Sequence, residues 1–280
     1  MRDATAEDTT RDADPLLQRA TGDGRVAFRL RDGATALADL YQSGAAKIRL
    51  PRHAEAPGRE AVLINTAGGL TGGDRLSFAV EAGAGTRVTA VTQASEKVYR
   101  ALGGVAEIAT TLTVGDGARL DWLPQDTILF DRSALSRTLT VDMAENASLV
   151  ALESVIFGRA AMAEAVASGQ FRESWRIRRG GRLVFADETR IGGPVADILA
   201  RAAVSGGRRA VATVVAVRPD AEALIDPVRA ALPEEAGASA WNGLLTARIA
   251  APDSRLLRQS LGRVLAVLRD GAPLPRVWTC

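Results

Sequence analysis

The sequence predicts an all-β protein: a right-handed β-helical two-layer sandwich, built from solenoid-like repeats, with two C-terminal α-helices. Three observations support this fold class. A turn followed by a β-rich run recurs at intervals of about 30 residues, which is typical of stacked coils. The chain has 280 residues, of which 47% are hydrophobic, so it can bury a sizeable core. Towards the C-terminus the hydrophobic period changes from that of a strand to that of a helix.

Four segments share the repeat. Each begins with a Gly or Asn that can adopt positive φ in a turn, and each continues as a run of strand-forming residues. The segments are Gly85–Gln93, Gly117–Gln125, Asn146–Glu153 and Gly181–Asp187. Stacked coils explain their spacing, and an ordinary antiparallel sandwich with coincidental turns is the alternative.

The regions before the repeats are assigned in chain order. Residues 1–20 are polar and rich in Asp, Glu and Thr, so they are expected to form a disordered tail. Residues 21–280 are expected to form one domain, in which the β-helical sandwich ends near residue 220. Residues 26–50 read as an initial strand region, and 53–59 as a loop.

Two helices and a last strand are predicted after residue 220. A short helix is expected over 221–231, a strand over 244–250 and a longer helix after Asp253 or Ser254, which can cap it. Gly271 and Pro273 end that helix. Its apolar face consists of Leu256, Leu257, Leu261, Val264, Leu265 and Leu268. Burying six such side chains, at about 1.5–3 kcal/mol each, would anchor the helix to a sheet.

A glycine-rich segment, LINTAGGLTGGD at residues 63–74, is the most unusual local feature. Gly68, Gly69, Gly72 and Gly73 would be costly in entropy unless the backbone needs positive φ or a close approach there. The segment lacks the Lys-Ser or Lys-Thr of a phosphate loop, and its spacing is not that of a dinucleotide fingerprint. A structural corner is therefore the favoured interpretation from the pattern alone.

A polar side chain recurs near the end of each repeat, at Gln93, Gln125, Glu153 and Asp187. Four stacked coils would align these positions. The side chains of a buried polar column need hydrogen bonds, oppositely charged partners or water, because an unpaired buried carboxylate costs several kcal/mol. One hypothesis is a water-filled passage edged by oxygen ligands, and the alternative is that the residues end their strands at the surface.

The residues available for catalysis are few. His53 is the only histidine and Cys280 the only cysteine, so one chain cannot build a nucleophilic triad or a soft-ligand metal cluster. Glu153 and Asp187 could still serve as the paired carboxylates of a carbohydrate-active β-solenoid. The arginines between 172 and 182 alternate with other residues as on a strand, which favours a solvated sheet face over a nucleic-acid stripe.

The sequence also bears on the compartment. The longest apolar runs are too short for a membrane span, and residues 1–14 lack the apolar core of a signal peptide. One terminal cysteine excludes an internal disulfide. A cytoplasmic protein is expected.

Five segments resemble motifs of one family, and they come in that family's order. They are Thr66–Asp74 (TAGGLTGGD), Ala94–Arg100 (ASEKVYR), Trp122–Phe130 (WLPQDTILF), Phe157–Glu164 (FGRAAMAE) and Leu274–Trp278 (LPRVW). They are similar to motifs of the UreD (UreH) urease accessory proteins. The resemblance implies a non-enzymatic scaffold that binds apo-urease, recruits UreF and UreG, and assists nickel insertion. A plain structural repeat or binding protein is the remaining alternative.

The resemblance also suggests residues for nickel. It places Asp74, Glu153 and Asp187 at acidic positions of the kind proposed to line a nickel passage. Glu96, where some relatives are expected to carry a small residue, joins Gln93 and Gln125 as a candidate passage or structural residue. No tightly bound cofactor is expected, only transient Ni²⁺, because weak oxygen ligands release an ion that thiolates would hold.

Overall fold

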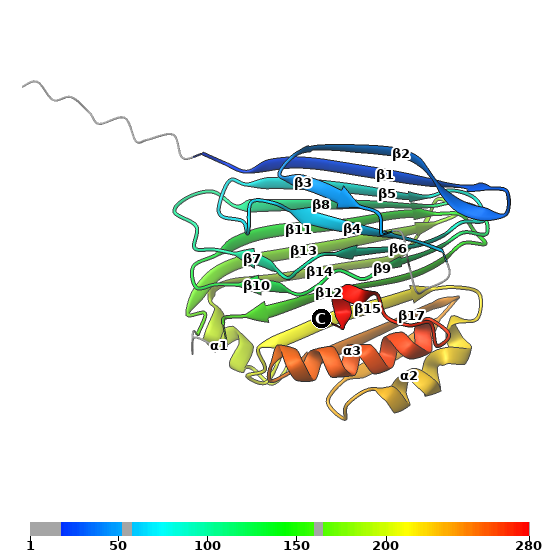
Figure 1. The fold of residues 1–280 in the computed structure, drawn as a ribbon. Helices are drawn as coiled ribbons and strands as arrows, with labels where there is room; N and C mark the ends of the chain where they lie inside the picture. Colours follow the sequence, from blue (N-terminus) through cyan, green and yellow to red (C-terminus); the bar gives the residue numbers. More distant parts are fainter. Residues whose placement is uncertain (1–17, 52–57, 160–164, 280) are drawn as a thin grey trace, which may run out of the picture.

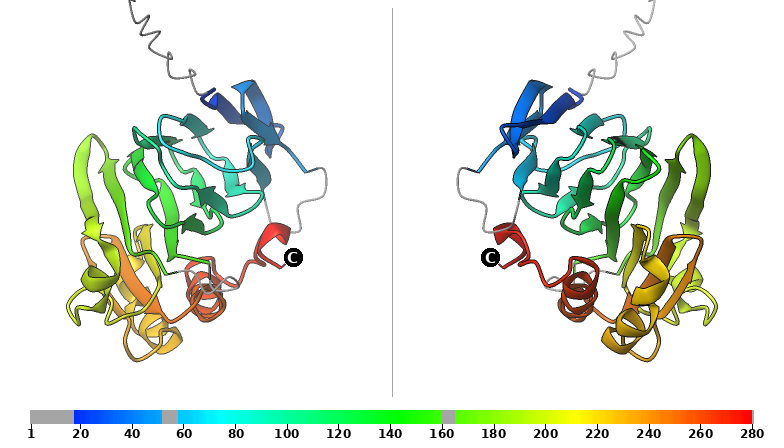
Figure 2. Two further views of the ribbon diagram at one scale, coloured as in Figure 1. Left: turned by 90° about the vertical axis from the view of Figure 1, so that its left-hand side faces the viewer. Right: turned by 90° about the vertical axis from the view of Figure 1, so that its right-hand side faces the viewer.

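The computed structural model describes residues 18–51, 58–159 and 165–279, and it confirms the predicted all-β, solenoid-like fold class. Two sheets face each other (Figures 1 and 2). Seven strands form sheet A, in the order β14-β13-β11-β8-β5-β1-β2. Their bounds are β1 Thr21–Arg31, β2 Ala34–Gly44, β5 Arg75–Ala82, β8 Ala106–Val114, β11 Ala134–Met143, β13 Ser168–Arg179 and β14 Arg182–Pro194.

Sheet B has ten strands, and its main path runs β16-β17-β15-β12-β9-β6-β4-β3, with β7 and β10 attached beside it. The bounds are β3 Ala46–Arg49, β4 Arg59–Asn65, β6 Arg87–Thr92, β7 Glu96–Val98, β9 Arg119–Trp122, β10 Thr127–Leu129, β12 Ser148–Phe157, β15 Ala210–Val217, β16 Gly237–Trp241 and β17 Leu244–Ala251. From β4 to β13 the chain passes back and forth between the sheets. Successive strands in each sheet are therefore parallel neighbours.

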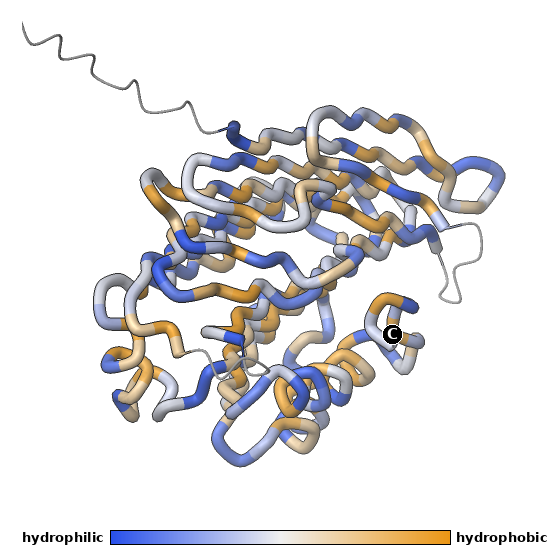
Figure 3. Tube along the Cα trace, turned by 60° about the vertical axis from the view of Figure 1, so that its left-hand side comes forward, coloured by the Kyte–Doolittle hydropathy of each residue, from blue (hydrophilic) through white to orange (hydrophobic). Residues whose placement is uncertain are grey.

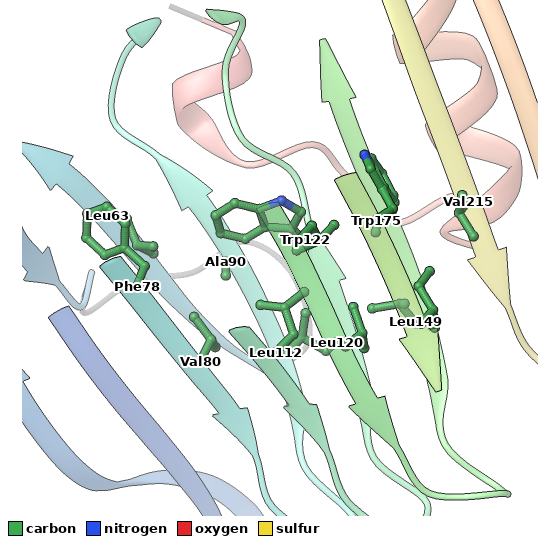
Figure 4. Close-up of a cluster of buried hydrophobic side chains, with 14 of the residues drawn as sticks. Leu63, Phe78, Val80, Ala90, Leu112, Leu120, Trp122, Leu149, Trp175 and Val215 are labelled. Atoms are coloured by element: carbon green, nitrogen blue, oxygen red, sulfur yellow. The ribbon is translucent and has the colours of Figure 1, made fainter. Parts of the chain in front are cut away.

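Three of the four predicted repeats stack as expected. Val88 in β6 pairs with Leu120 in β9, which in turn pairs with Leu149 in β12. All three side chains are buried between the sheets, and Figure 4 shows Leu120 and Leu149 among them. The repeat found in the sequence is thus a true coil of the solenoid.

The fourth repeat departs from the prediction. Gly181–Asp187 does not stack on the other three, because the chain turns at Gly180 and Gly181 and returns along β13 as an antiparallel hairpin. Asp187 therefore lies in sheet A, opposite Trp175. A glycine turn before a strand looks the same in a hairpin and in a solenoid coil, so the sequence pattern could not separate the two.

The helices follow the predicted positions. Residues 221–231 form a 3₁₀ turn, Ala221–Leu224, and helix α2, Ile225–Ala231. Helix α3, Ser254–Leu268, starts at Asp253, whose side chain accepts a hydrogen bond from the Leu256 amide. Five of its six predicted apolar residues are buried, and Leu256 is half-buried. A short helix α1, Val195–Ala200, and a 3₁₀ turn, Arg276–Trp278, are additional.

The two sheets differ in what covers them. One apolar core lies between the sheets, and a second lies between sheet B and helices α2 and α3. Strand β12 is buried along both faces and reads as a nearly continuous apolar run, SLVALESVIF. Strand β13 instead alternates between buried and more exposed residues. Figure 3 shows hydrophilic and hydrophobic residues alternating along the strands farthest from the helices.

Several predicted features fall on residues that the structure does not describe. Residues 1–17 of the predicted tail, most of the 53–59 loop with His53, part of the Phe157–Glu164 motif, and Cys280 lie outside the described residues. The initial strand region is described and forms β1, β2 and β3. None of the described helices has the length and apolar character needed to cross a bilayer.

Candidate functional site

A row of polar residues crosses the otherwise apolar space between the sheets. On sheet A, neighbouring strands place Arg137, Glu173 and Thr189 side by side. On sheet B, neighbouring strands do the same for Glu153, Thr213 and Arg248. Strand alternation puts each set on the inner face of its sheet, so the two sets lie opposite each other.

Arg137 joins the two sets at the buried end of the row. Its Nη1 lies 2.6 Å from Glu153 Oε2, and its Nε donates a 2.9 Å hydrogen bond to Glu173 Oε1. The Thr127 hydroxyl accepts a 2.8 Å bond from Nη1, and Trp122 Nε1 donates a 3.0 Å bond to Glu153 Oε1. The three charged side chains are 4–7% exposed. Their charges are therefore paired inside the protein, as burial demands.

Burial has a direct effect on Glu153. It raises the pKa of this carboxyl to about 7, against the opposing effects of Arg137 and the Trp122 hydrogen bond. The nearby Glu173 carboxylate also raises the pKa, because two like charges in one site repel each other. Because the pKa of Glu153 is close to neutral pH, a small change in its surroundings alters the protonation of this carboxyl.

A cavity of about 420 Å³ opens beside this cluster. Its polar lining includes Glu153, Glu173, Thr189, Thr213, Arg248 and Glu235, and its apolar lining includes Val155, Phe157, Phe171 and Ile191. Glu235 and Arg248 are exposed, whereas Glu153 and Glu173 are buried. The polar row therefore leads from the surface to the buried carboxylates.

Asp187 lies near the outer part of this row. Its Oδ1 is 2.6 Å from Arg248 Nη2, which links sheet A to sheet B. Among the described residues, five buried side-chain polar atoms have no hydrogen-bond partner, and three of them are Asp187 Oδ2, Trp175 Nε1 and Thr246 Oγ1. Trp175 is the strand partner of Asp187, and Thr246 is two residues from Arg248. Buried polar atoms of this kind are ordinarily satisfied by water.

Asp74 has a different environment. It is 4% exposed, but Oδ1 accepts a 2.8 Å bond from the Ala20 amide and Oδ2 a 2.7 Å bond from the Thr71 amide. These bonds tie the glycine-rich segment to the start of β1. Asp74 is absent from the lining of the 420 Å³ cavity, so its contacts describe a structural brace.

The glycines around Asp74 have the geometry that the sequence predicts. Gly68, Gly69 and Gly73 have φ values of 76°, 149° and 91°. Gly72 is needed for close approach instead, because a Cβ there would lie 2.2 Å from the Gly103 carbonyl oxygen. The segment is therefore a tightly packed corner between two coils.

The remaining predicted residues do not share one column. Gln93 is exposed. Gln125 is buried and accepts a hydrogen bond from Arg258 on α3, so it faces the helix rather than the space between the sheets. Glu96 lines a separate cavity of about 210 Å³ at the glycine corner and accepts a 3.0 Å bond from Asn65. Burial raises the Glu96 pKa to about 7.

Two residues of the cluster, Arg137 and Glu173, were not predicted from the sequence, although their positions on the strands could have indicated them. Arg137 lies two residues from both Leu135 and Leu139, and Glu173 lies two residues from both Phe171 and Trp175. Each therefore shares a strand face with apolar residues, where the strand period predicts an apolar side chain. A charged residue in the apolar phase of each of two strands indicates a buried ion pair. The described residues contain no group of three or more His, Cys, Asp or Glu side chains placed to bind a metal ion.

Comparisons with known proteins identify the family. A family model described as UreD urease accessory protein matches residues 20–279. The chain belongs to the UreD family. The urease accessory protein UreD of Rhizobium leguminosarum bv. trifolii is 56% identical over 263 residues, covering 93% of this chain and 96% of that protein. The proteins of the same name from Mesorhizobium japonicum and Agrobacterium fabrum are 48% and 47% identical, over 95% and 93% of this chain and 96% and 92% of their own lengths.

Membership of the UreD family confirms the resemblance and gives the chain an accessory role in urease maturation. Several family-like motifs also meet in the structure. Tyr99 packs edge-on against Phe130 with ring centroids 5.1 Å apart, and Trp278 Nε1 donates a 3.0 Å bond to the Leu123 carbonyl. These contacts join the second, third and last motifs.

Proposed function

We propose that the chain is a non-catalytic scaffold that binds apo-urease, recruits UreF and UreG, and assists the insertion of nickel into the urease active site in the cytoplasm. Its membership of the UreD family supports this proposal. The observation that carries the nickel part is the polar row beside the 420 Å³ cavity, which gives the buried Glu153 and Glu173 carboxylates a route towards the surface.

The chemistry of the row suits a divalent cation in transit. Its lining offers carboxylate and hydroxyl oxygens, together with room for water, and Ni²⁺ accepts such donors. Arg137 offsets one of the two negative charges, so the cluster attracts a divalent cation less strongly than two free carboxylates would. A raised Glu153 pKa further weakens binding, because a proton competes with the ion. Weak binding favours release to urease over retention.

The residue assignments change with this geometry. Glu153 keeps the passage role predicted from the sequence, and Glu173 joins it. Asp187 acts beside the outer part of the row through its ion pair with Arg248. Asp74 is assigned a structural role, because both its oxygens are occupied by backbone amides.

The test compares substitutions of Glu153 in a reconstituted system of this chain, UreF, UreG and urease apoprotein. Glu153→Leu places an apolar side chain beside the cavity and is expected to reduce nickel loading of urease at least tenfold. Glu153→Ala is expected to reduce it less, because water can refill the space and supply oxygen donors. Nickel bound to urease is measured by elemental analysis, and complex formation by size-exclusion chromatography.

Measuring complex formation separates the scaffold part of the proposal from the nickel-passage part. Both variants are expected to assemble with urease apoprotein as the unaltered chain does, because Glu153 is buried. Leu152→Met, a buried neighbour on β12 that faces α3, serves as the packing control and should load nickel normally. Normal nickel loading by Glu153→Leu would refute the passage and leave a docking scaffold only.

The carbohydrate-active alternative lacks support from this geometry. It requires two carboxylates free to act on one substrate. Glu153 is held by Arg137 and Trp122, and Asp187 by Arg248.

A further inference from the structure

Arg137 lies at the buried end of the polar row, bound to both carboxylates that an ion in the cavity would meet. Glu153 and Glu173 are among the described residues that line the 420 Å³ cavity, and Arg137 is not. Its Nη1 contacts Glu153 Oε2 and the Thr127 hydroxyl, and its Nε and Nη2 donate hydrogen bonds to Glu173 Oε1. An ion that arrives from the cavity therefore finds a cation already paired with these carboxylates.

An arginine cannot release these carboxylates by losing its proton, because a guanidinium stays protonated in proteins. Arg137 can therefore give way to another cation only by moving, and its surroundings offer support for a displaced guanidinium. The Thr127 hydroxyl accepts a 2.8 Å bond from Nη1, and the Phe171 ring centroid lies 5.9 Å from Cζ, within the range of a cation–π contact. Strand register also places Glu96 directly beside Thr127, so a further carboxylate lies next to that hydroxyl.

Glu173 offers an arriving ion the easier first contact. Both hydrogen bonds from Arg137 reach the same oxygen, Oε1, so they leave Oε2 of Glu173 to other partners. In Glu153 each oxygen has a donor, because Oε2 contacts Arg137 and Oε1 accepts a hydrogen bond from Trp122. A cation can thus bind Glu173 before Arg137 moves, which permits the guanidinium and the ion to exchange in steps.

We propose that Arg137 is an exchangeable counter-cation of the passage. An arriving divalent ion displaces the guanidinium from Glu173 and then from Glu153, and the returning guanidinium displaces the ion. The guanidinium keeps its charge throughout. Because a buried carboxylate without a partner is costly, the guanidinium returns as the ion leaves. Arg137 thereby sets how long an ion stays. The proposal rests on the proposed function and adds the residue that prevents the ion from being retained.

The test removes the guanidinium without changing the charge of the cluster. Two carboxylates and one guanidinium carry a formal charge of −1, and Arg137→Gln combined with Glu173→Gln keeps −1 through Glu153 alone. Ni²⁺ binding is measured by equilibrium dialysis at pH 7.5. A site that a competitor occupies most of the time binds its ligand more weakly, so the double variant is expected to bind Ni²⁺ at least about tenfold more tightly than the unaltered chain, although it has lost a carboxylate.

The same variant separates binding from delivery. With no guanidinium to displace it, the bound ion leaves more slowly, so the initial rate of nickel loading of urease should fall at least about threefold. Arg137→Lys keeps the positive charge but replaces three donor nitrogens by one ammonium, so its affinity for Ni²⁺ should lie between those of the unaltered chain and the double variant. An Arg137 that serves only to stabilise the fold predicts no gain in affinity for either variant.

A matched control lies on the outer face of the same sheet. Arg172→Gln combined with Glu188→Gln removes a 3.3 Å ion pair between β13 and β14, and should bind Ni²⁺ within about twofold of the unaltered chain. Adding Glu153→Gln to the Arg137/Glu173 variant should abolish the gain in affinity. A gain that survives this third substitution would place the ion elsewhere and overturn the proposal.

Failure of the exchange can be told from failure of the passage. If Glu153→Leu loads urease normally, the passage fails and the exchange fails with it. If Glu153→Leu blocks loading but the Arg137/Glu173 variant binds Ni²⁺ no more tightly than the unaltered chain, the passage stands and Arg137 is only a structural ion pair. Should the double variant not unfold cooperatively, Arg137→Lys decides alone, and an affinity no higher than that of the unaltered chain overturns the exchange.

Discussion

Asp74 and Glu153 are both acidic residues with 4% exposure, yet their surroundings differ, and we propose different roles for them. Asp74 sits in a turn, and backbone amides of Ala20 and Thr71 occupy its two oxygens. Glu153 meets the side chains of Arg137 and Trp122 and lies beside a cavity. Burial alone therefore does not distinguish the two proposed roles. The partners of each carboxylate and its access to a cavity do.

The largest effect is expected at the residue that pairs the buried glutamates. Arg137→Met leaves Glu153 and Glu173 without their cation inside the core, which should lower the free energy of unfolding by about 3–5 kcal/mol at pH 7.5. Chemical denaturation measures this. The loss should shrink at pH 5.5, where protonation relieves the unpaired charge.

A double-mutant cycle sharpens this expectation. Adding Glu153→Gln to Arg137→Met should restore part of the lost stability, because one of the two unpaired charges is gone. Arg178→Met on the exposed outer face of β13 is the control and should change stability by less than about 0.5 kcal/mol. A similar loss for Arg178 and Arg137 would mean that the buried cluster contributes nothing specific.

Asp74→Ala should have the next largest effect. It removes two charge-assisted hydrogen bonds and leaves the Ala20 and Thr71 amides without their acceptor, at a cost of about 2–3 kcal/mol. Nickel loading of urease per folded molecule should remain normal, in contrast to Glu153→Leu. A specific loss of nickel loading in a stably folded Asp74 variant would contradict the structural role.

The glycine corner should respond in a graded way. Gly68→Ala meets open space but keeps a φ of 76°, so strain of about 1 kcal/mol is expected. Gly72→Ala should cost more, because its Cβ would press on the Gly103 and Gly104 carbonyl oxygens at 2.2 and 2.7 Å. Thermal unfolding of the two variants tests this order, and the reverse order would refute the close approach as the reason for Gly72.

The sequence predicts the solenoid better than it predicts the site. The spacing of the turns predicted the β6–β9–β12 stack, because each coil repeats a similar turn followed by an apolar residue that points into the core. It could not show that β14 turns back on β13, since a hairpin uses the same glycines. The partners of Glu153 come from three other strands, β9, β11 and β13, whose alignment depends on the register of the folded sheets. Only the charged residues in the apolar phase, Arg137 and Glu173, could have indicated the cluster.

The smallest expected effect is on the pH dependence of stability, in which the buried Glu153 should differ from the exposed Glu188. The folded-state pKa of Glu153, about 7, lies above its ordinary value of 4.5. Its contribution to stability is therefore fully present below pH 4.5 and lost as the pH rises through 7. The pKa of Glu188 shifts in the opposite direction, because hydrogen bonds from Arg190 and Arg172 lower it. The contribution of Glu188 to stability is therefore present above pH 4.5 and lost as the pH falls.

Glu153→Gln should flatten the decline in unfolding free energy between pH 4.5 and 7. It should not abolish the decline, because Glu96 also has a pKa raised to about 7. Glu188→Gln should leave that decline in place. An unchanged pH profile for Glu153→Gln would show that Arg137 keeps Glu153 ionised throughout this range, and the proton would then not compete with a cation at the buried end of the row.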